Sequence, residues 1–242
     1  MARFYSANDI INRAALEAGL VPVSDPVGSG DESFVQLSGL LNSAGQEMIE
    51  LHPWQGLRKK YSFTTQAGDT GAYDLPSDFS YMVDQTGWNR SANLPLGGPL
   101  SAQTWSYLDG LDLLESPIYA LFQLMENKFQ LFPQPPPVGI EIAFQYQSRD
   151  WVLTQSTGIT GEIVTQGSDT VMYEPILIIK LLLAKFLSAK GFDSSAARLE
   201  FDTLFQSRTG KDKGADVLNA GNCGRGYPLI NMQNAPWTGY GH

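Results

Sequence analysis

The spacing of hydrophobic residues changes twice along this chain, and the order of the changes limits the folds open to it. Apolar residues recur at helical spacing in 6–19, 32–52, 173–191 and 193–210. Between the second and the third of these segments, they alternate with polar residues as in strands. Helical stripes at the two ends of a chain must meet to bury their apolar faces. The sequence therefore predicts an α+β fold, in which two N-terminal and two C-terminal helices form a four-helix bundle around an inserted antiparallel β domain.

Local signals mark where these helices begin and end. Ser6 is predicted to cap the first helix with Asp9 three residues later, and Gly19 to end it. Pro175 suits the first turn of the third helix, and Asp193 suits the cap of the fourth. The second helix carries one apolar face over nearly five turns, which predicts a core face or, alternatively, a seam between subunits; it consists of Phe34, Leu37, Leu41, Ala44, Met48 and Leu51.

The middle of the chain has the alternation and turn residues of short strands. Two apolar runs flank Glu126–Asn127, and this pattern predicts a β-hairpin. Ser101 is predicted to cap a short helix, and Trp54 to close the end of the bundle. The predicted strands cover residues 61–65, 72–76, 79–88, 119–125, 128–132 and 139–147.

The last part of the chain reads as an extended arm. Glycine, asparagine and proline separate its large apolar side chains, so it has too little continuous apolar surface to form a core of its own. Large apolar side chains on an extended segment indicate that the segment binds to another protein surface. The predicted anchors to a partner are Tyr227, Leu229, Ile230, Met232 and Trp237.

These patterns divide the chain into four predicted parts. The N-terminal bundle helices take 1–56, the inserted β domain takes 57–165, and the C-terminal bundle helices take 166–210, followed by the extended arm at 211–242.

Composition and charge argue against several classes of protein. The formal net charge is −9 and the pI is about 4.6, which argues against wrapping nucleic acid by neutralising phosphates, although an acidic wall could let DNA slide past. Cys223 is the only cysteine, so an intrachain disulfide is impossible. The longest apolar run, 175–187, is short and holds two lysines, so we expect a buried helix and no membrane partner.

The sequence offers no clear set of catalytic, cofactor-binding or metal-ligating residues, and we expect none. The two histidines, His52 and His242, have no supporting catalytic motif, and phosphate-binding and dinucleotide-binding glycine motifs are missing. The acidic residues at Asp25, Asp31 and Glu32 lack the pattern of a calcium loop, so a solvated loop is the preferred interpretation.

A set of three acidic residues leaves an enzymatic alternative open. Asp109, Asp112 and Glu115 lie in sequence near the aromatic residues Trp105, Tyr107 and Tyr119. Glycosidases use two carboxylates beside aromatic platforms, so hydrolysis of a glycan is a less favoured hypothesis.

The N-terminal half resembles the head-to-tail adaptors of short-tailed bacteriophages, also called connector or tail tubular A proteins. The resemblance rests on four segments. They are Ala-Asn-Asp-Ile-Ile-Asn-Arg-Ala-Ala-Leu-Glu-Ala-Gly at 7–19 with the Pro22 turn, the long helix ending in Glu-Leu-His-Pro-Trp at 50–54, the strand 61–64, and Tyr-Asp-Leu-Pro-Ser-Asp-Phe at 73–79.

The resemblance implies a virion structural protein that is not an enzyme. Such adaptors form a ring of roughly twelve copies that binds the portal protein on one side and the tail nozzle or tube on the other. Genomic DNA would pass through the lumen without sequence-specific binding, and the ring would be assembled in the cytoplasm of the host bacterium. Another virion structural role, or a receptor-binding module, is the alternative.

Overall fold

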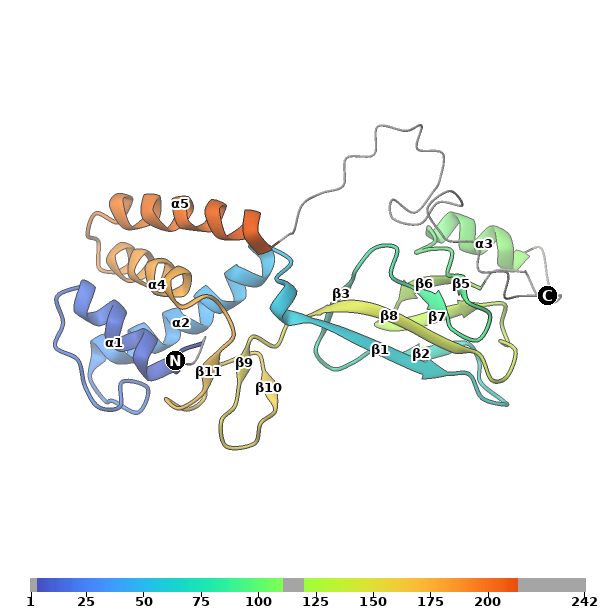
Figure 1. Cartoon of the computed structure of the whole chain (residues 1–242), viewed down its shortest axis with the longest axis horizontal. Helices are drawn as coiled ribbons and strands as arrows, with labels where there is room; N and C mark the ends of the chain where they lie inside the picture. Colours follow the sequence, from blue (N-terminus) through green and yellow to red (C-terminus); the bar gives the residue numbers. More distant parts are fainter. Residues whose placement is uncertain (1–3, 111–119, 213–242) are drawn as a thin grey trace, which may run out of the picture.

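The computed structural model describes residues 4–110 and 120–212. These residues form a mixed α+β protein with five α-helices and antiparallel sheets. The two largest of their hydrophobic clusters divide them into a helical lobe, built from 4–57 and 151–212, and a β lobe, built from 58–110 and 120–150. The lobes lie end to end and meet at a narrow waist (Figure 1).

The first two helices follow the predicted signals closely. Helix α1 is Ala7–Glu17 and α2 is Glu32–Leu51. Ser6 Oγ accepts from the backbone N–H of Asp9, and Gly19 ends the α1 segment at a φ of 79°. The predicted apolar face of α2 is buried except at Leu51, which is 41% exposed because it is the last residue of the helix.

The C-terminal helices pack onto the N-terminal ones. Helix α4, Pro175–Ala189, is apolar on nearly all sides and contacts α1, α2 and α5. Helix α5, Ser195–Asp212, lies along α4 (Figure 1). Four helices from the two ends of the chain therefore share one core, although these contacts centre on α4 and do not by themselves establish a regular four-helix bundle.

The C-terminal end of α5 differs from the prediction. Helical spacing was expected to end at residue 210, with a linker from Lys211, but Lys211 and Asp212 are both helical. The reason is tertiary, because Asp212 is bound by residues 52–55 at the end of α2.

The main sheet of the β lobe is built around β8, the long strand predicted near residues 139–147. Strands β1 and β4 flank β8, β5 pairs with β4, and β3 also pairs with β8. The short turn η1 leads from α2 into β1. The bounds are η1 Gln55–Leu57, β1 Arg58–Thr64, β3 Phe79–Met82, β4 Trp88–Asn89, β5 Leu94–Pro95 and β8 Glu141–Ser148.

A strand predicted over 79–88 is interrupted in the structure. Gln85 has a φ of 58°, so the chain bends between β3 and β4. Thr86 Oγ1 accepts from the backbone N–H of Gln145 at this bend. The two strands therefore pair with β8 at separate places, β3 near Tyr146–Ser148 and β4 at Ile142–Ala143.

A three-stranded sheet covers the inner face of the main sheet. It contains β2, Ala72–Asp74, β7, Lys128–Phe132, and β6, Leu121–Met125, in the order β2-β7-β6. The predicted hairpin is confirmed, since Glu126 and Asn127 both have positive φ, as a tight two-residue turn requires. Helix α3, Ala102–Gly110, begins at the predicted cap Ser101, and none of its residues is buried.

A small sheet between the lobes belongs to the helical core. It consists of β9, Val152–Leu153, β10, Thr160–Gly161, and β11, Thr170–Val171. Trp151, Val152 and Val171 are fully buried in the same cluster as the helices. The predicted β domain, 57–165, includes β9 and β10, whereas Trp151 and Val152 share the buried cluster of the helices.

Candidate interaction surfaces

The predicted arm anchors lie outside the described residues. Tyr227, Leu229, Ile230, Met232 and Trp237 all belong to 213–242, so the structure does not test their role. Helix α5 is described as far as Asp212, which lies beside the waist (Figure 1).

The last turn of α5 is held firmly against the end of α2. Asp212 Oδ2 lies 3.1 Å from His52 Nε2 and accepts from the backbone N–H of Gln55 at 3.0 Å. The side chain of Gln55 also donates to the carbonyl of Asp212. His52 is buried edge-on against Trp54 and Phe205, so its contact with Asp212 joins the end of α5 to the end of α2.

A cluster of large aromatic residues fills the helical side of the waist. Trp151 stacks on Tyr173 with ring centroids 5.7 Å apart, and Tyr173 meets Trp54 edge-on at the same distance. Tyr173 donates to the carbonyl of Gly45 at 3.0 Å. The indole of Trp151 lies so close to Gly45 that a Cβ built there would be 2.2 Å from the ring. The second helix therefore needs glycine at this position.

A polar network joins the β lobe to the small sheet across the waist. Asp78 accepts hydrogen bonds from Lys59 Nζ at 2.7 Å, from Tyr146 at 2.9 Å and from Ser148 at 2.7 Å. Lys59 also donates to Thr160, at 3.0 Å. Burial alone would raise the pKa of Asp78, but the bonds from Lys59, Ser148 and Tyr146 outweigh it and hold that pKa below its usual value. Asp78 is therefore a charged anchor point of the waist.

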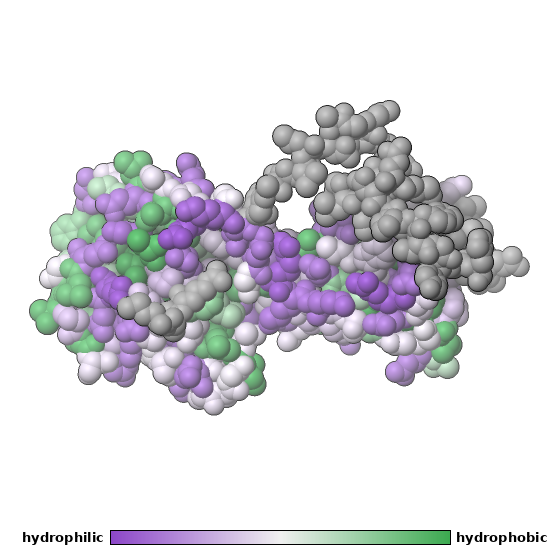
Figure 2. All heavy atoms as spheres, viewed as in Figure 1, coloured by the Kyte–Doolittle hydropathy of each residue, from purple (hydrophilic) through white to green (hydrophobic). Residues whose placement is uncertain are grey.

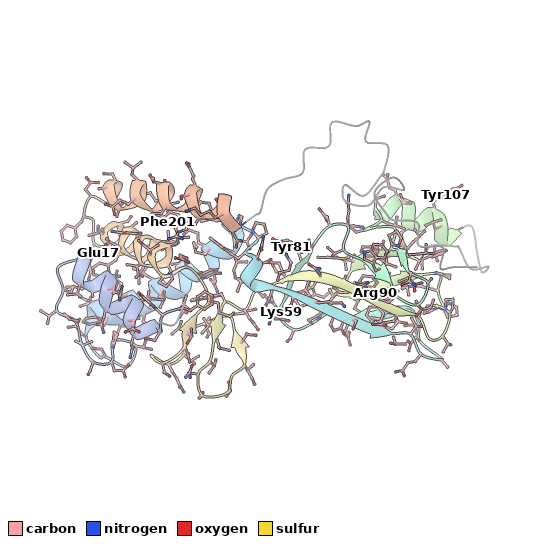
Figure 3. The ribbon with its side chains drawn as sticks, in the orientation of Figure 1. Glu17, Lys59, Tyr81, Arg90, Tyr107 and Phe201 are labelled. Carbon is pink, nitrogen blue, oxygen red and sulfur yellow. The ribbon has the colours of Figure 1, made fainter. Side chains whose placement is uncertain are left out.

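The outer face of the main sheet is polar and has no helix over it in the described part of the chain. Exposed Arg58 and Lys60 project from β1, and Arg90 lies over the ring of Trp88 at 5.9 Å. Figure 2 shows hydrophilic side chains over the waist and the adjoining part of this face, near the positions of Lys59 and Arg90 in Figure 3.

A groove runs along the N-terminal half of α4, between α1 and α5. Its volume is about 690 Å³, and its apolar lining comes from Leu16, Pro175, Ile176 and Ile179. Leu16 is 57% exposed and Ile176 is 39% exposed. The sequence analysis missed this surface, although two signals were present: Leu16 falls outside the core stripe of α1, and α4 is apolar on more sides than one helix neighbour can cover.

The acidic residues singled out from the sequence have structural roles or lie on the surface. Asp31 caps α2 by accepting from the backbone N–H of Ser33, and Asp25 accepts from Asn8. Asp109 is exposed on α3, while Asp112 and Glu115 lie outside the described residues. The catalytic carboxylate hypothesis therefore gains no support from the part of the chain that can be seen.

Within residues 4–110 and 120–212, no three His, Cys, Asp or Glu side chains are grouped closely enough to hold a metal ion. Among the helices in the same ranges, none combines the length and apolarity needed to cross a membrane.

Comparison with known proteins gives one result that covers most of the molecule. The family model described as "SU10 adaptor protein" matches residues 5–222, which include both lobes and the waist. No curated protein sequence matches the chain.

Proposed function

Because the chain belongs to the SU10 adaptor protein family, we propose that it is a structural protein of a bacteriophage virion, acting as an adaptor between the head and the tail. The observation that carries the proposal is the length of the match, since residues 5–222 take in the helical lobe, the waist and the β lobe. The adaptor role accordingly falls to the whole molecule and not to one module. It needs binding surfaces and no catalytic group.

We place the protein in a ring that joins the portal protein to the tail nozzle or tube of a short-tailed phage. The support is the resemblance of the N-terminal segments to adaptors that form rings of roughly twelve copies. Twelve copies with a net charge of −9 would carry about −108, and a wall of that charge repels the phosphates of DNA and avoids holding it.

The division into lobes supports a revised domain proposal. We assign 58–150 to an inserted β domain, and we assign the helices before and after it to one four-helix unit. We place the C-terminal end of the inserted β domain at 150 and not at 165, because Trp151 and Val152 are buried in the helical core. The arm then begins after Asp212, two residues later than the sequence indicated.

We further propose that the arm makes the contacts that hold the adaptor in the assembly. Its anchors are Tyr227, Leu229, Ile230, Met232 and Trp237. The support from the described residues is the firm attachment of Asp212 to His52 and Gln55, which fixes where the arm starts. A fixed start reduces the conformational freedom lost when the arm binds.

The test is the native mass of the purified chain, alone and after mixing with the portal protein of the same phage. A portal-bound ring of roughly twelve copies is expected. A version lacking 214–242 keeps all of α5 and should stay folded while failing to join the portal. A full-length chain that ignores the portal, or that forms a trimer with or without it, would contradict the adaptor proposal.

A further inference from the structure

The groove between α1 and α5 has the properties of a docking site for an apolar segment. Its floor is formed by Ile176 and Ile179 of α4, and Leu16 of α1 forms one wall. Exposed leucine and isoleucine side chains around one concave surface are the usual mark of a binding groove, because isolated exposed residues do not line a common hollow.

Five charged side chains line this groove, and four of them form ion pairs, while the fifth, Arg13, lies over the ring of Tyr5 at 4.3 Å. Lys180 Nζ lies 2.8 Å from Glu17 and 2.7 Å from Glu200, which joins α4 to both neighbouring helices. At the end nearest the waist, Arg208 pairs with Glu174 at 3.4 Å. Figure 3 labels Glu17 at this side of the helical lobe. A segment that enters the groove therefore needs apolar side chains and no charge of its own.

One segment of this chain has that composition. Residues 226–241 contain no Asp, Glu, Lys or Arg, and they include all five predicted anchors. Within them, Tyr-Pro-Leu-Ile-Asn-Met at 227–232 is the densest apolar stretch. Its side chains could cover Leu16 and Ile176, the exposed leucine and isoleucine of the groove, and remove apolar surface from water on both sides.

The length of the intervening chain favours a groove on another copy. The residues from 213 to 226 could span about 45 Å, whereas α4 is only about 22 Å long. The groove of the same molecule begins within about one helical turn of Asp212, because Arg208 lines it. So long a connection is unnecessary for the near groove but suits one on a neighbour.

We propose that the α1–α4–α5 groove of each copy binds residues 227–232 of a neighbouring copy. This inference rests on the proposed function, since it supplies the contact between adjacent adaptors in the ring. Each copy would give one arm and receive one, which is a head-to-tail interface that closes into a ring.

The test uses a disulfide between the two surfaces. Cys223 is the only native cysteine, so a C223S background allows one cysteine in the groove, L16C, and one in the arm, I230C. After assembly with the portal and mild oxidation, a non-reducing gel is expected to show a ladder of covalent multimers. The matched control replaces L16C with L199C, which puts the thiol on an even more exposed leucine of α5, outside the groove lining.

Each other outcome overturns the assignment. A crosslinked species that migrates as a monomer would place the segment on its own groove. An equal ladder from L199C would show random collision, and a missing ladder in rings of normal mass would show that the arm docks elsewhere. If the native mass shows that rings never form, the adaptor proposal fails instead, and the two failures are distinguishable.

Discussion

The helical lobe and the β lobe bury hydrophobic surface in different ways. The helical lobe joins the two ends of the chain around aliphatic residues of α4, and ion pairs such as Lys180–Glu17 and Lys185–Glu47 link its helices. The β lobe is one continuous stretch of chain around stacked aromatic rings, with Phe129 between Phe122 and Phe144.

The two lobes also differ in charge. The helical lobe has seven Lys and Arg residues against fourteen Asp and Glu, while the β lobe has six against eight. Most of the acidity of the chain therefore lies in the lobe whose helices are held together by ion pairs. We therefore expect salt and low pH to change the stability of the helical lobe and of the β lobe by different amounts.

The largest expected effect is the loss of the aromatic stack in the β lobe. Phe129→Ala removes a ring that is 1% exposed and lies 4.8 Å and 5.3 Å from its two neighbours. We expect the β lobe to lose about 4 kcal/mol of unfolding free energy. Urea unfolding followed by near-ultraviolet and far-ultraviolet circular dichroism should show aromatic order lost before helicity. Simultaneous loss of both signals would mean that the lobes unfold as one unit.

The second largest effect is expected from disturbing the packing of Trp151 against α2, on the helical side of the waist. Gly45→Ala places a methyl group against the indole of Trp151, which is completely buried, so we expect a loss of about 3 kcal/mol. Gly39→Ala is the matched control in the same helix, since a Cβ there meets nothing within 4 Å. The control should gain up to about 1 kcal/mol from helix propensity. Equal effects of the two changes, measured by thermal unfolding, would argue against the close contact.

Asp78 allows the waist to be tested by acid. Its folded pKa lies below the usual 3.8, so its stabilising contribution is present above that pH and is lost as the pH falls through the folded pKa. Asp78→Asn should cost about 2 kcal/mol at neutral pH, because it removes the charge that three donors share. Below about pH 4, the difference in unfolding free energy between the variant and the natural protein should become smaller. A constant gap across that range, in urea titrations at each pH, would contradict this role.

The smallest effect is expected from removing ion pairs, one set within the helical lobe and one pair within the β lobe. Lys180→Met removes a side chain that is 19% exposed and bridges Glu17 to Glu200, so we expect a loss of about 1 kcal/mol that shrinks at high salt. Lys128→Met is the control in the β lobe, where the partner Asp74 is 88% exposed. It should change stability very little. A larger loss from Lys128→Met would reverse the comparison.

Much of the fold could be predicted because local signals and burial agree. Ser6 and Gly19 mark the two ends of the α1 segment by a side-chain cap and by backbone freedom, and Glu126–Asn127 adopts the turn that its position between two strands indicates. Such features depend on residues close in sequence, so a sequence pattern is enough to find them.

Other features of the structure depend on residues far apart in the chain. The extension of α5 through Lys211 and Asp212 requires His52 and Gln55, about 160 positions earlier. The small sheet joins the helical core because Trp151 stacks on Tyr173, which no local pattern indicates. The groove is a surface shared by three helices, so its residues cannot be recognised before those helices are placed.

The waist has a mechanical consequence. The chain enters the β lobe at the start of β1 and leaves it at the end of β8, and these two points are paired, Arg58 opposite Gln147. A pull along the long axis of the molecule (Figure 1) therefore stretches two adjacent backbones together instead of peeling one from the other. The β1–β8 pair would share a tensile load between the two lobes, so that neither backbone would carry it alone.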